Sequence, residues 1–343
     1  MPHAFYFYRT IRLLFLINAC IIIYIMENIL NIENLNMGFN TEKGFRQALF
    51  DISFSLKKGQ THALVGESGC GKSMTAMSIL KLLPKNANIS SGKIVYNNQN
   101  LLEFTTEQMQ GIRGAKIALI PQDPMTSLNP LYTIGNQLIE VIELHQNLKG
   151  DDAKKRAIEA LNKVQIPSAE ERFYQYPHEF SGGMKQRAII AMALACNAEI
   201  IIADEPTTAL DVTIQAQIMN LLAEIKKEYG TSILLITHDL AVVSQNADEV
   251  SVMYSGRIVE NAPTKEFFEH TNHPYSIGLL KSIPQDKTRK LFAIKGQPPS
   301  INEDINGCRF HNRCSFNIPN LCNRKVPELK EVAPQHCSAC FLN

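Results

Sequence analysis

THALVGESGCGKSMTAMSILKLL, residues 61–83, is the stretch of sequence that decides the fold. Its first part, His62–Val65, is a short apolar run typical of a buried strand, and it continues directly into a loop with three glycines. The segment Met74–Leu83 then has the composition of a helix that ends before Pro84. A strand, a glycine-rich loop and a helix in this order indicate an α/β protein with a functional loop at the carboxyl end of a strand.

The loop Gly66–Ser73 matches the P-loop pattern, in which a glycine and four further residues precede Gly71-Lys72-Ser73. In such loops the backbone N–H groups surround phosphate oxygens, and the dipole of the following helix favours negative charge. We expect Lys72 to contact the β- and γ-phosphates of a nucleotide and the Ser73 hydroxyl to bind Mg²⁺. The expected nucleotide-binding residues of this segment are Gly66, Glu67, Ser68, Gly69, Cys70, Gly71, Lys72, Ser73 and Met74.

Two further apolar runs, Ile200–Ala203 and Ile233–Ile236, flank a helical pattern over 212–228. Continuous apolar runs are typical of parallel strands covered on both faces, so these segments predict a βαβ unit. Asp204 and Glu205 follow the first run, at the edge where ligands of open α/β sheets bind. We expect Asp204 to bind Mg²⁺ and Glu205 to be the general base that polarises the attacking water. An N-cap pair for the next helix is the alternative.

Other elements are predicted around this unit. Ala48–Leu56 alternates apolar and polar residues, as a half-buried strand does. A strand at Ile117–Ile120 and helices at 133–145, 151–164 and Met184–Cys196 follow from the remaining apolar patterns. A linker before a cysteine-rich tail is marked by Pro284, Pro298 and Pro299.

Length and composition limit the class of protein. A chain of 343 residues suggests two domains, or one large domain with an appendage. With 45% hydrophobic and 20% charged residues the chain has globular composition, which excludes a mainly disordered, collagen-like or coiled-coil protein. A formal charge of +1 gives no electrostatic signal for nucleic acid. Five of the eight cysteines lie in the last 36 residues, which favours a local metal or cluster site over a disulfide scaffold.

Residues 1–25 form an apolar extension. Leu13–Met26 is apolar except for Asn18 and follows two arginines, as in a signal sequence or anchor. The run is shorter than the about 18–20 residues that span a bilayer, and no small-x-small cleavage site follows it. Because the segment from Met26 already resembles a first strand, we expect translation to start there, with a membrane anchor as the alternative.

The segment Phe180–Arg187, FSGGMKQR, resembles the signature motif of ABC-transporter ATPases. Other motifs occur in the order known for this family: Gln122 resembles the Q-loop, Ala209-Leu210-Asp211 the D-loop and His238 the switch histidine. The resemblance covers about residues 27–262.

This resemblance implies an α/β fold, namely a P-loop NTPase core of the ABC ATPase type. The ATPase domain would span residues 26–262 and contain an antiparallel β subdomain and a helical signature-motif subdomain at about 123–195. A C-terminal extension with a cysteine cluster would follow at 263–343.

The resemblance also implies ATP and Mg²⁺ as cofactors and a head-to-tail pair of ATPase domains. In such a pair Ser181 and Gly183 would contact the γ-phosphate bound by the partner's P-loop. Gln122 would sense Mg²⁺ and water and link to membrane subunits, while His238 would hold the γ-phosphate and order Glu205. The expected catalytic residues are Glu205, His238 and Gln122, the expected Mg²⁺ ligands are Ser73, Gln122 and Asp204, and the further nucleotide contacts are Ser181, Gly182, Gly183, Asp211 and Phe45.

Two residues, Phe45 and Met184, differ from the family pattern in spacing or in residue type. Phe45 is the nearest aromatic candidate for stacking on adenine, and an ordinary hydrophobic contact is the alternative. Met184 stands where the signature commonly has glutamine. Because Ser181 and the glycines of the motif are kept, we expect contact with ATP to persist.

The tail carries Cys308, Cys314, Cys322, Cys337 and Cys340, whose thiols favour iron–sulfur or zinc coordination but lack paired C-x₂-C spacing. The segments GQPPSINEDINGC, HPYSIGLLKSIP and PQDPMTSLNP resemble ATP-binding subunits of the di- and oligopeptide importer group. There, a histidine precedes the last cysteine by four residues, which corresponds to His336 and Cys340. The resemblance implies a [4Fe-4S] cluster on Cys308, Cys314, Cys322 and Cys340, with Cys337 as an alternative fourth ligand. A zinc site, or reduced or disulfide-linked cysteines, are the other interpretations.

The resemblance therefore implies an ATP-hydrolysing, energy-coupling subunit of an importer for dipeptides or oligopeptides, peripheral to the cytoplasmic face of the inner membrane. Its partners would be two membrane permease subunits, a second and different ATPase subunit and, indirectly, an extracytoplasmic solute-binding protein, without nucleic acid. Uptake of nickel or another small solute is the alternative. A soluble ABC-type ATPase acting on nucleic acid or ribosomes is disfavoured, because neither a long coiled-coil insertion nor a second ATPase domain is visible.

Overall fold

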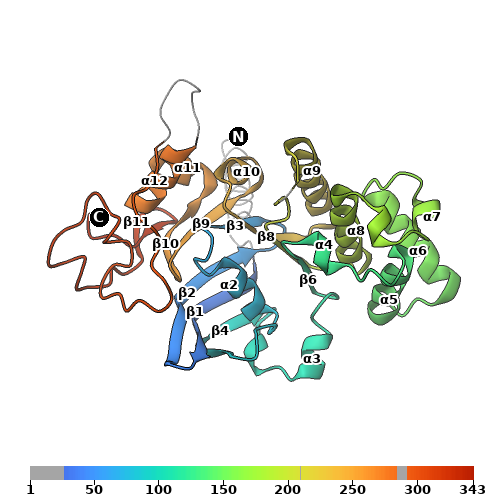
Figure 1. The fold of residues 1–343 in the computed structure, drawn as a ribbon, viewed down its shortest axis with the longest axis horizontal. Helices are drawn as coiled ribbons and strands as arrows, with labels where there is room; N and C mark the ends of the chain where they lie inside the picture. The colour runs from blue at the N-terminus through green and yellow to red at the C-terminus, as the bar shows by residue number, and fades with distance from the viewer. Residues whose placement is uncertain (1–26, 209, 284–291) are drawn as a thin grey trace, which may run out of the picture.

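The computed structural model describes residues 27–208, 210–283 and 292–343 (Figure 1). The predicted extension at 1–25, Ala209 of the expected D-loop and Pro284 of the expected linker lie outside the described residues. The helical subdomain lies at one end of the molecule and the C-terminal extension at the other, with the sheets between them (Figure 1).

An eight-stranded sheet runs through the molecule in the order β11-β12-β10-β9-β3-β8-β7-β6. The strands β6, β7, β8, β3 and β9 are parallel, and the other three continue the sheet antiparallel. The strand bounds are β3 (Thr61–Val65), β6 (Ile117–Ile120), β7 (Ile200–Asp204), β8 (Ser232–Thr237), β9 (Glu249–Tyr254), β10 (Arg257–Pro263), β11 (Lys330–Ala333) and β12 (His336–Ser338).

The central strands β3, β7 and β8 are buried at every residue, as their continuous apolar runs predict for strands covered on both faces. Helix α9 (Val212–Tyr229) connects β7 to the parallel β8, which confirms the predicted βαβ unit. In the register, Val65 pairs with Thr237 and Asp204 with Ile236. The residues that follow these three strands therefore leave the sheet at one edge.

A second, antiparallel sheet has the order β2-β1-β4-β5 and forms the expected β subdomain. Its inward side chains, among them Met37, Leu49 and Ile52, share a core cluster with Leu64 and Ile202 of the large sheet. The elements of this region are β1 (Asn28–Thr41), β2 (Gly44–Lys57), α2 (Lys72–Ile79), β4 (Ala87–Tyr96), β5 (Gln99–Asn100), η1 (Leu101–Glu103) and α3 (Thr106–Gln110).

The helix after the P-loop is shorter than predicted, because it ends at Ile79 and not at Leu83. Arg113 donates hydrogen bonds to the carbonyl oxygens of Leu80 and Lys81, at 2.8 and 3.1 Å. Lys81 has a positive φ of 51°, which turns the chain away from the helix axis. A side chain 33 residues away in the sequence thus satisfies the carbonyl groups at the helix end, so Pro84 is not what stops the helix.

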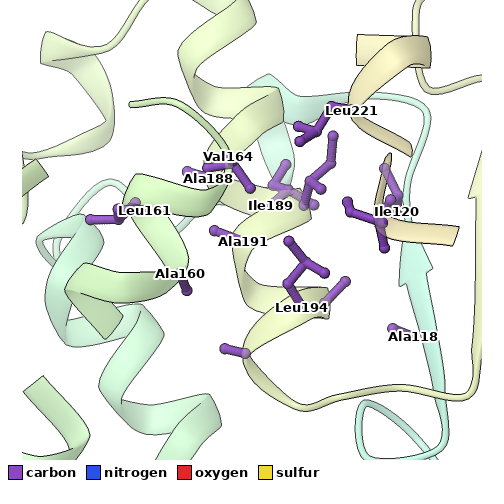
Figure 2. Close-up of a cluster of buried hydrophobic side chains, with 14 of the residues drawn as sticks. Ala118, Ile120, Ala160, Leu161, Val164, Ala188, Ile189, Ala191, Leu194 and Leu221 are labelled. Carbon is purple, nitrogen blue, oxygen red and sulfur yellow. The ribbon is translucent and has the colours of Figure 1, made fainter. Parts of the chain in front are cut away.

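The helical subdomain packs through small side chains on two of its helices. Ala153, Ala157 and Ala160 are buried at helical spacing on α6, and α8 is buried along most of its length. Figure 2 shows Ala160, Leu161 and Val164 facing Ala188 and Ala191 in this cluster. The helices are α4 (Pro124–Ser127), α5 (Ile134–Gln146), α6 (Gly150–Lys163), α7 (Ala169–Arg172), η2 (Pro177–Glu179) and α8 (Gly182–Ala195).

The C-terminal extension is joined to the large sheet by hydrogen-bonded strands. β12 pairs with β10 through Glu260↔Ser338 and Asn261↔Cys337. A third core cluster unites Phe267, Tyr275 and Phe310 with Tyr254 of β9. The helices in this part of the chain are α10 (Leu240–Asn246), α11 (Thr264–His270) and α12 (Pro274–Ser282). Within the described ranges, no helix has both the length and the apolar character needed to cross a membrane.

Candidate active site

The P-loop forms a tight turn around its own lysine. Lys72 is 4% exposed, and its Nζ donates hydrogen bonds to the carbonyl oxygens of Gly66 and Glu67, at 2.8 and 3.1 Å. Gly71 has a φ of 111°, which a side chain would strain. A Cβ at Gly66 would lie 2.2 Å from the backbone oxygen of Met253 on β9. The glycines are therefore required by this path of the backbone, which places Lys72 at the start of α2.

Asp204, at the end of β7, offers a buried carboxylate oxygen with no partner. The residue is 4% exposed, and Oδ1 accepts no hydrogen bond from the described residues. Burial raises the pKa of this carboxyl because it disfavours the charged form, and a hydrogen bond from the Ser73 side chain partly offsets this rise. A free carboxylate oxygen beside a hydroxyl is an oxygen ligand set of the kind that Mg²⁺ prefers. These two side chains fit the ion that the sequence led us to expect.

Glu205 is the centre of a second group of side chains. Its Oε2 accepts hydrogen bonds from Gln122 Nε2 at 3.0 Å and from Thr208 Oγ1 at 2.9 Å. Its Oε1 lies 3.4 Å from Nδ1 of His238. The residue has a positive φ of 48°, which directs the chain away from β7 directly after the last strand residue. Gln122 and His238, which the sequence predicted as a catalytic set with Glu205, thus each contact Glu205.

The surroundings of Glu205 suit a proton acceptor, because its carboxylate lies beside an exposed side chain at the carboxyl edge of the sheet. Its side chain is 11% exposed, whereas that of His238 is 60% exposed. The carboxylate is held by neutral donors, so one oxygen can accept a proton from a water molecule that approaches from the open side. Thr208 was not predicted as a site residue. Its position, a hydroxyl residue three places after Glu205, was the only sign in the sequence that it could contact the carboxylate.

The signature and D-loop residues lie against each other. Ser181 is the N-cap of α8, and its Oγ accepts a hydrogen bond from the Met184 N–H at 3.3 Å. Asp211 is the N-cap of α9, with a bond of 2.9 Å from the Ile214 N–H to its Oδ1. A Cβ at Gly183 would lie 2.8 Å from Cγ2 of Ile214. The two helix N-termini therefore approach each other closely, and Gly182 lies beside Leu210.

Phe45 lies near the turn between β1 and β2. Its backbone pairs with Asn40, and the ring is 47% exposed. A Cβ at Gly38 would lie 2.6 Å from the ring, so the phenylalanine packs over this glycine. This is a hydrophobic contact of the kind set out as the alternative, and stacking on adenine stays a prediction.

The tail cysteines divide into two groups. Cys308, Cys314, Cys322 and Cys340 lie close enough to affect one another: burial, and then the neighbouring thiols, raise the pKa of Cys308 to about 11. Burial, and then the charges of Glu331 and Glu249, raise the pKa of Cys337 on β12. All seven described cysteines are free of disulfide bonds. In the part of the chain that the structure describes, no three or more His, Cys, Asp or Glu side chains form a group that could hold a metal ion.

His336 has a structural role beside Glu260. Its Nε2 lies 2.8 Å from Glu260 Oε1, and both side chains are at most 1% exposed. Glu260 also accepts hydrogen bonds from the N–H groups of Asn272 and His273, at 2.7 and 3.0 Å. This network ties β12 to β10 and to the start of α12.

Comparisons with known proteins agree with this fold. A family model described as ABC transporter matches residues 49–208, and one described as oligopeptide/dipeptide transporter, C-terminal region, matches residues 259–322. A solved bacterial ABC transporter cassette, a dimer, has a TM-score of 0.62 at 26% identity over 68% of this chain and 98% of its own. A Clostridium perfringens protein, part of an ABC transporter complex, has a TM-score of 0.61 at 30% identity over 74% of this chain and 95% of its own.

Curated relatives match nearly the whole chain. A dipeptide transport ATP-binding protein of Bacillus subtilis is 47% identical and covers 92% of this chain and 95% of the relative. An oligopeptide transport ATP-binding protein of Escherichia coli is 44% identical, with coverage of 92% and 93%. A probable peptide ABC transporter ATP-binding protein of Sinorhizobium fredii is 46% identical, with 91% and 94%. The fold and site define a P-loop ATPase, and the chain belongs to the ABC transporter family of ATP-hydrolysing cassettes.

Proposed function

We propose that this chain is the ATP-hydrolysing subunit of an importer for dipeptides or oligopeptides. The observation that carries the proposal is the contact of Glu205 with Gln122 and His238, at the same sheet edge as Lys72 and Asp204. The cargo class is supported by relatives whose names state dipeptide or oligopeptide transport and by the match of the C-terminal region.

In the proposed reaction the P-loop binds the phosphates of ATP. Lys72 contacts the β- and γ-phosphates from the start of α2. Mg²⁺, when held by Ser73 and Asp204 with Gln122 nearby, would neutralise charge that develops on the phosphates. The segment Gly66–Met74 supplies the backbone N–H groups that surround the anion.

Glu205 accepts a proton from water while Gln122 orients that water. The water oxygen forms a bond to the γ-phosphorus, the bond from this phosphorus to the bridging oxygen breaks, and the proton goes to Glu205. The bridging oxygen leaves with ADP, while His238 holds the γ-phosphate and keeps Glu205 in place through its 3.4 Å contact.

A second ATPase subunit completes the site. Ser181, Gly182 and Gly183 would contact the γ-phosphate of the partner's nucleotide, with Asp211 beside them. We propose that the partner is a different chain, as the resemblance implies. Recovery of this chain as the only ATPase in a purified complex would contradict that part of the proposal.

The permease subunits would contact the helical subdomain. Apolar side chains stand exposed there, on and before α5, and a shallow hollow is lined by Tyr132, Ile139 and Leu144. The helical subdomain begins with α4, two residues after Gln122, so a permease that moves this subdomain also moves Gln122 relative to Glu205. The chain would thus act as a peripheral subunit at the cytoplasmic face of the membrane, with a solute-binding protein on the other side and without nucleic acid.

We further propose that residues 26–262 act as the ATPase domain, with a helical subdomain at about 123–195, and that 263–343 form an extension with a [4Fe-4S] cluster. The cluster ligands would be Cys308, Cys314, Cys322 and Cys340. The other three thiols raise the pKa of Cys308, whereas no thiol contributes to the pKa of Cys337, so Cys340 is preferred to Cys337 as the fourth ligand. The described side chains do not form a metal-holding group as they stand, so the four thiols would have to converge on the cluster.

The test of the ATPase assignment is a Glu205→Gln variant of the purified complex with its permeases. We expect ATP affinity to stay within about twofold of wild type and hydrolysis to fall about 100-fold or more, because the general base is lost. Glu224→Gln, on the exposed face of α9, is the matched control. Normal turnover of the Glu205→Gln complex would contradict the assigned base.

A further inference from the structure

The C-terminal extension reaches the P-loop through one ion pair. Arg313 donates hydrogen bonds from Nη1 and Nη2 to the two carboxylate oxygens of Glu67, at 2.8 and 3.1 Å. The two residues are 246 positions apart in the sequence. Parallel, two-point contact of a guanidinium with a carboxylate is the strong form of such pairs and fixes the geometry as well as the charge.

Arg313 is held on its other sides as well. Its side chain is 7% exposed, its Nε donates to the carbonyl oxygen of Lys295 at 3.1 Å, and its Nη1 also donates to the Tyr254 hydroxyl at 3.3 Å. Tyr254 in turn packs against Phe310, with ring centroids 5.1 Å apart. The guanidinium is therefore part of a buried network, so its position is set by the fold and not by the flexibility of its own side chain.

Glu67 connects this buried network to the phosphate-binding loop. Its N–H donates to the hydroxyl of Tyr275 on α12 at 3.0 Å, and its carbonyl oxygen accepts from Lys72 Nζ at 3.1 Å. Backbone and side chain of this second P-loop residue are thus both held by residues after β9. The same carboxylate stands beside the loop that must attract a triphosphate, and Arg313 neutralises its charge.

We propose that Arg313 is a positioning residue of the ATP site, which holds the P-loop in its phosphate-binding shape and cancels the charge of Glu67. The inference rests on the proposed role of the P-loop. Loss of Arg313 would remove one of the contacts that order the start of the loop, and it would leave an unpaired carboxylate close to the phosphates. Both effects weaken ATP binding, because a loop that must be ordered on binding lowers affinity and because like charges repel. In this proposal the C-terminal extension contributes to ATP binding through Arg313.

The experiment is a titration of the full chain with a fluorescent ATP analogue and Mg²⁺. We expect Arg313→Ala to raise the Kd about 10-fold, and the additional change Glu67→Gln to recover part of this loss by removing the charge. The exchanged pair Arg313→Glu with Glu67→Arg should recover affinity further. Arg46→Ala is the matched control, because its 2.9 Å ion pair with Asp304 also joins the β subdomain to the extension, away from the P-loop. We expect this control to bind as wild type does.

Steady-state kinetics of the assembled complex separate positioning from general damage. We expect KM for ATP to rise in Arg313→Ala while kcat changes less than about twofold, since Glu205 and its contacts are untouched. Affinity within twofold of wild type in Arg313→Ala, or no recovery in either double variant, would overturn the inference.

The variant Lys72→Ala separates a failure of the proposed function from a failure of this inference. Undiminished ATP binding by Lys72→Ala would contradict the proposed function. Loss of ATP binding by Lys72→Ala, together with no effect of Arg313→Ala, would contradict the inference alone. If Arg313→Ala does not fold, Arg313→Lys and the exchanged pair give the same comparison.

Discussion

Gln122 donates a hydrogen bond from Nε2 to Glu205 Oε2 over 3.0 Å, although 83 residues separate them in the sequence. The contact arises because Gln122 follows β6 and Glu205 follows β7, and these neighbouring strands are parallel with Ile120 opposite Ala203. α4 begins two residues after Gln122, so the helical subdomain is joined directly to the group that contacts the proposed base. Movement of that subdomain would therefore change the contact of Gln122 with Glu205.

The buried carboxyl of Asp204 predicts a stability that depends on pH and on Mg²⁺. Burial raises its pKa above the ordinary value of 3.8, so the folded state disfavours the charged form. As the pH rises above 3.8, the carboxyl ionises more readily in the unfolded chain than in the folded protein. The free energy of unfolding therefore decreases with rising pH in this range. Asp204→Asn removes this cost. We expect the variant to have a higher Tm than wild type at pH 7 in EDTA, with the difference shrinking toward pH 4.

Addition of Mg²⁺ and ATP should reverse that order. Wild type gains stability by binding, whereas Asp204→Asn has lost a charged ligand of the ion and should gain less. Differential scanning fluorimetry at both pH values, with and without Mg²⁺ and ATP, measures the effect. Equal stabilisation of both proteins by Mg²⁺ and ATP would argue against a role of Asp204 in binding the ion.

Ser181 should matter in the assembled complex and not in the isolated chain. Ser181→Asn keeps an oxygen that can cap α8 but changes the group offered to a partner's nucleotide. We expect the ATP affinity of the isolated chain to stay within about twofold and hydrolysis by the complex to fall about tenfold or more, through loss of a contact to the transferred phosphoryl group. Equal loss in both assays would indicate that Ser181 acts within its own subunit.

The pair of Glu260 and His336 should be the main polar support of the extension. Both side chains are at most 1% exposed, so His336→Ala leaves a buried carboxylate that keeps only its hydrogen bonds from the N–H groups of Asn272 and His273. We expect a loss of about 3–5 kcal/mol in the free energy of unfolding, measured with urea. The exposed pair of Glu328 and Lys330 is the control, and Lys330→Ala should cost at most about 1 kcal/mol. Similar values for the two variants would contradict a buried pair.

The grouping of the cysteines predicts which of them a cluster needs. Anaerobically purified protein should contain about four iron and four sulfide per chain if a [4Fe-4S] cluster is present. Cys337→Ser should keep this content, because burial and the charges of Glu331 and Glu249, and not the other thiols, raise the pKa of Cys337. Cys322→Ser should lose it, because Cys322 is one of the thiols that raise the pKa of Cys308. A colourless wild-type protein with stoichiometric zinc would overturn the cluster.

The sequence was sufficient for the central strands and the P-loop because their signals are local. The apolar runs at Ile200–Ala203 and Ile233–Ile236 need no knowledge of distant residues, and in a parallel sheet they place Asp204 and Glu205 at the ligand edge. The order of the family motifs then added Gln122 and His238, which the structure brings within hydrogen-bonding or ion-pair distance of Glu205.

Features that depend on distant contacts could not be predicted in this way. α2 ends early because Arg113 binds the carbonyl oxygens at its end, and local composition does not contain that information. The pair of Glu67 and Arg313 joins segments 246 residues apart, each ordinary in its own context. The sequence leaves Cys337 as an alternative to Cys340 as the fourth ligand, and spacing alone does not show that Cys337 lies opposite Asn261 on β10.

The most direct test of the central claim is uptake of labelled di- and oligopeptides, with labelled nickel in parallel, by cells whose only copy of this protein is wild type or Glu205→Gln. The account predicts that the variant cells lose peptide uptake while nickel uptake is unchanged. Intact peptide uptake with lost nickel uptake would contradict the proposed cargo, and no change in either would contradict the proposal that ATP hydrolysis by this chain powers import.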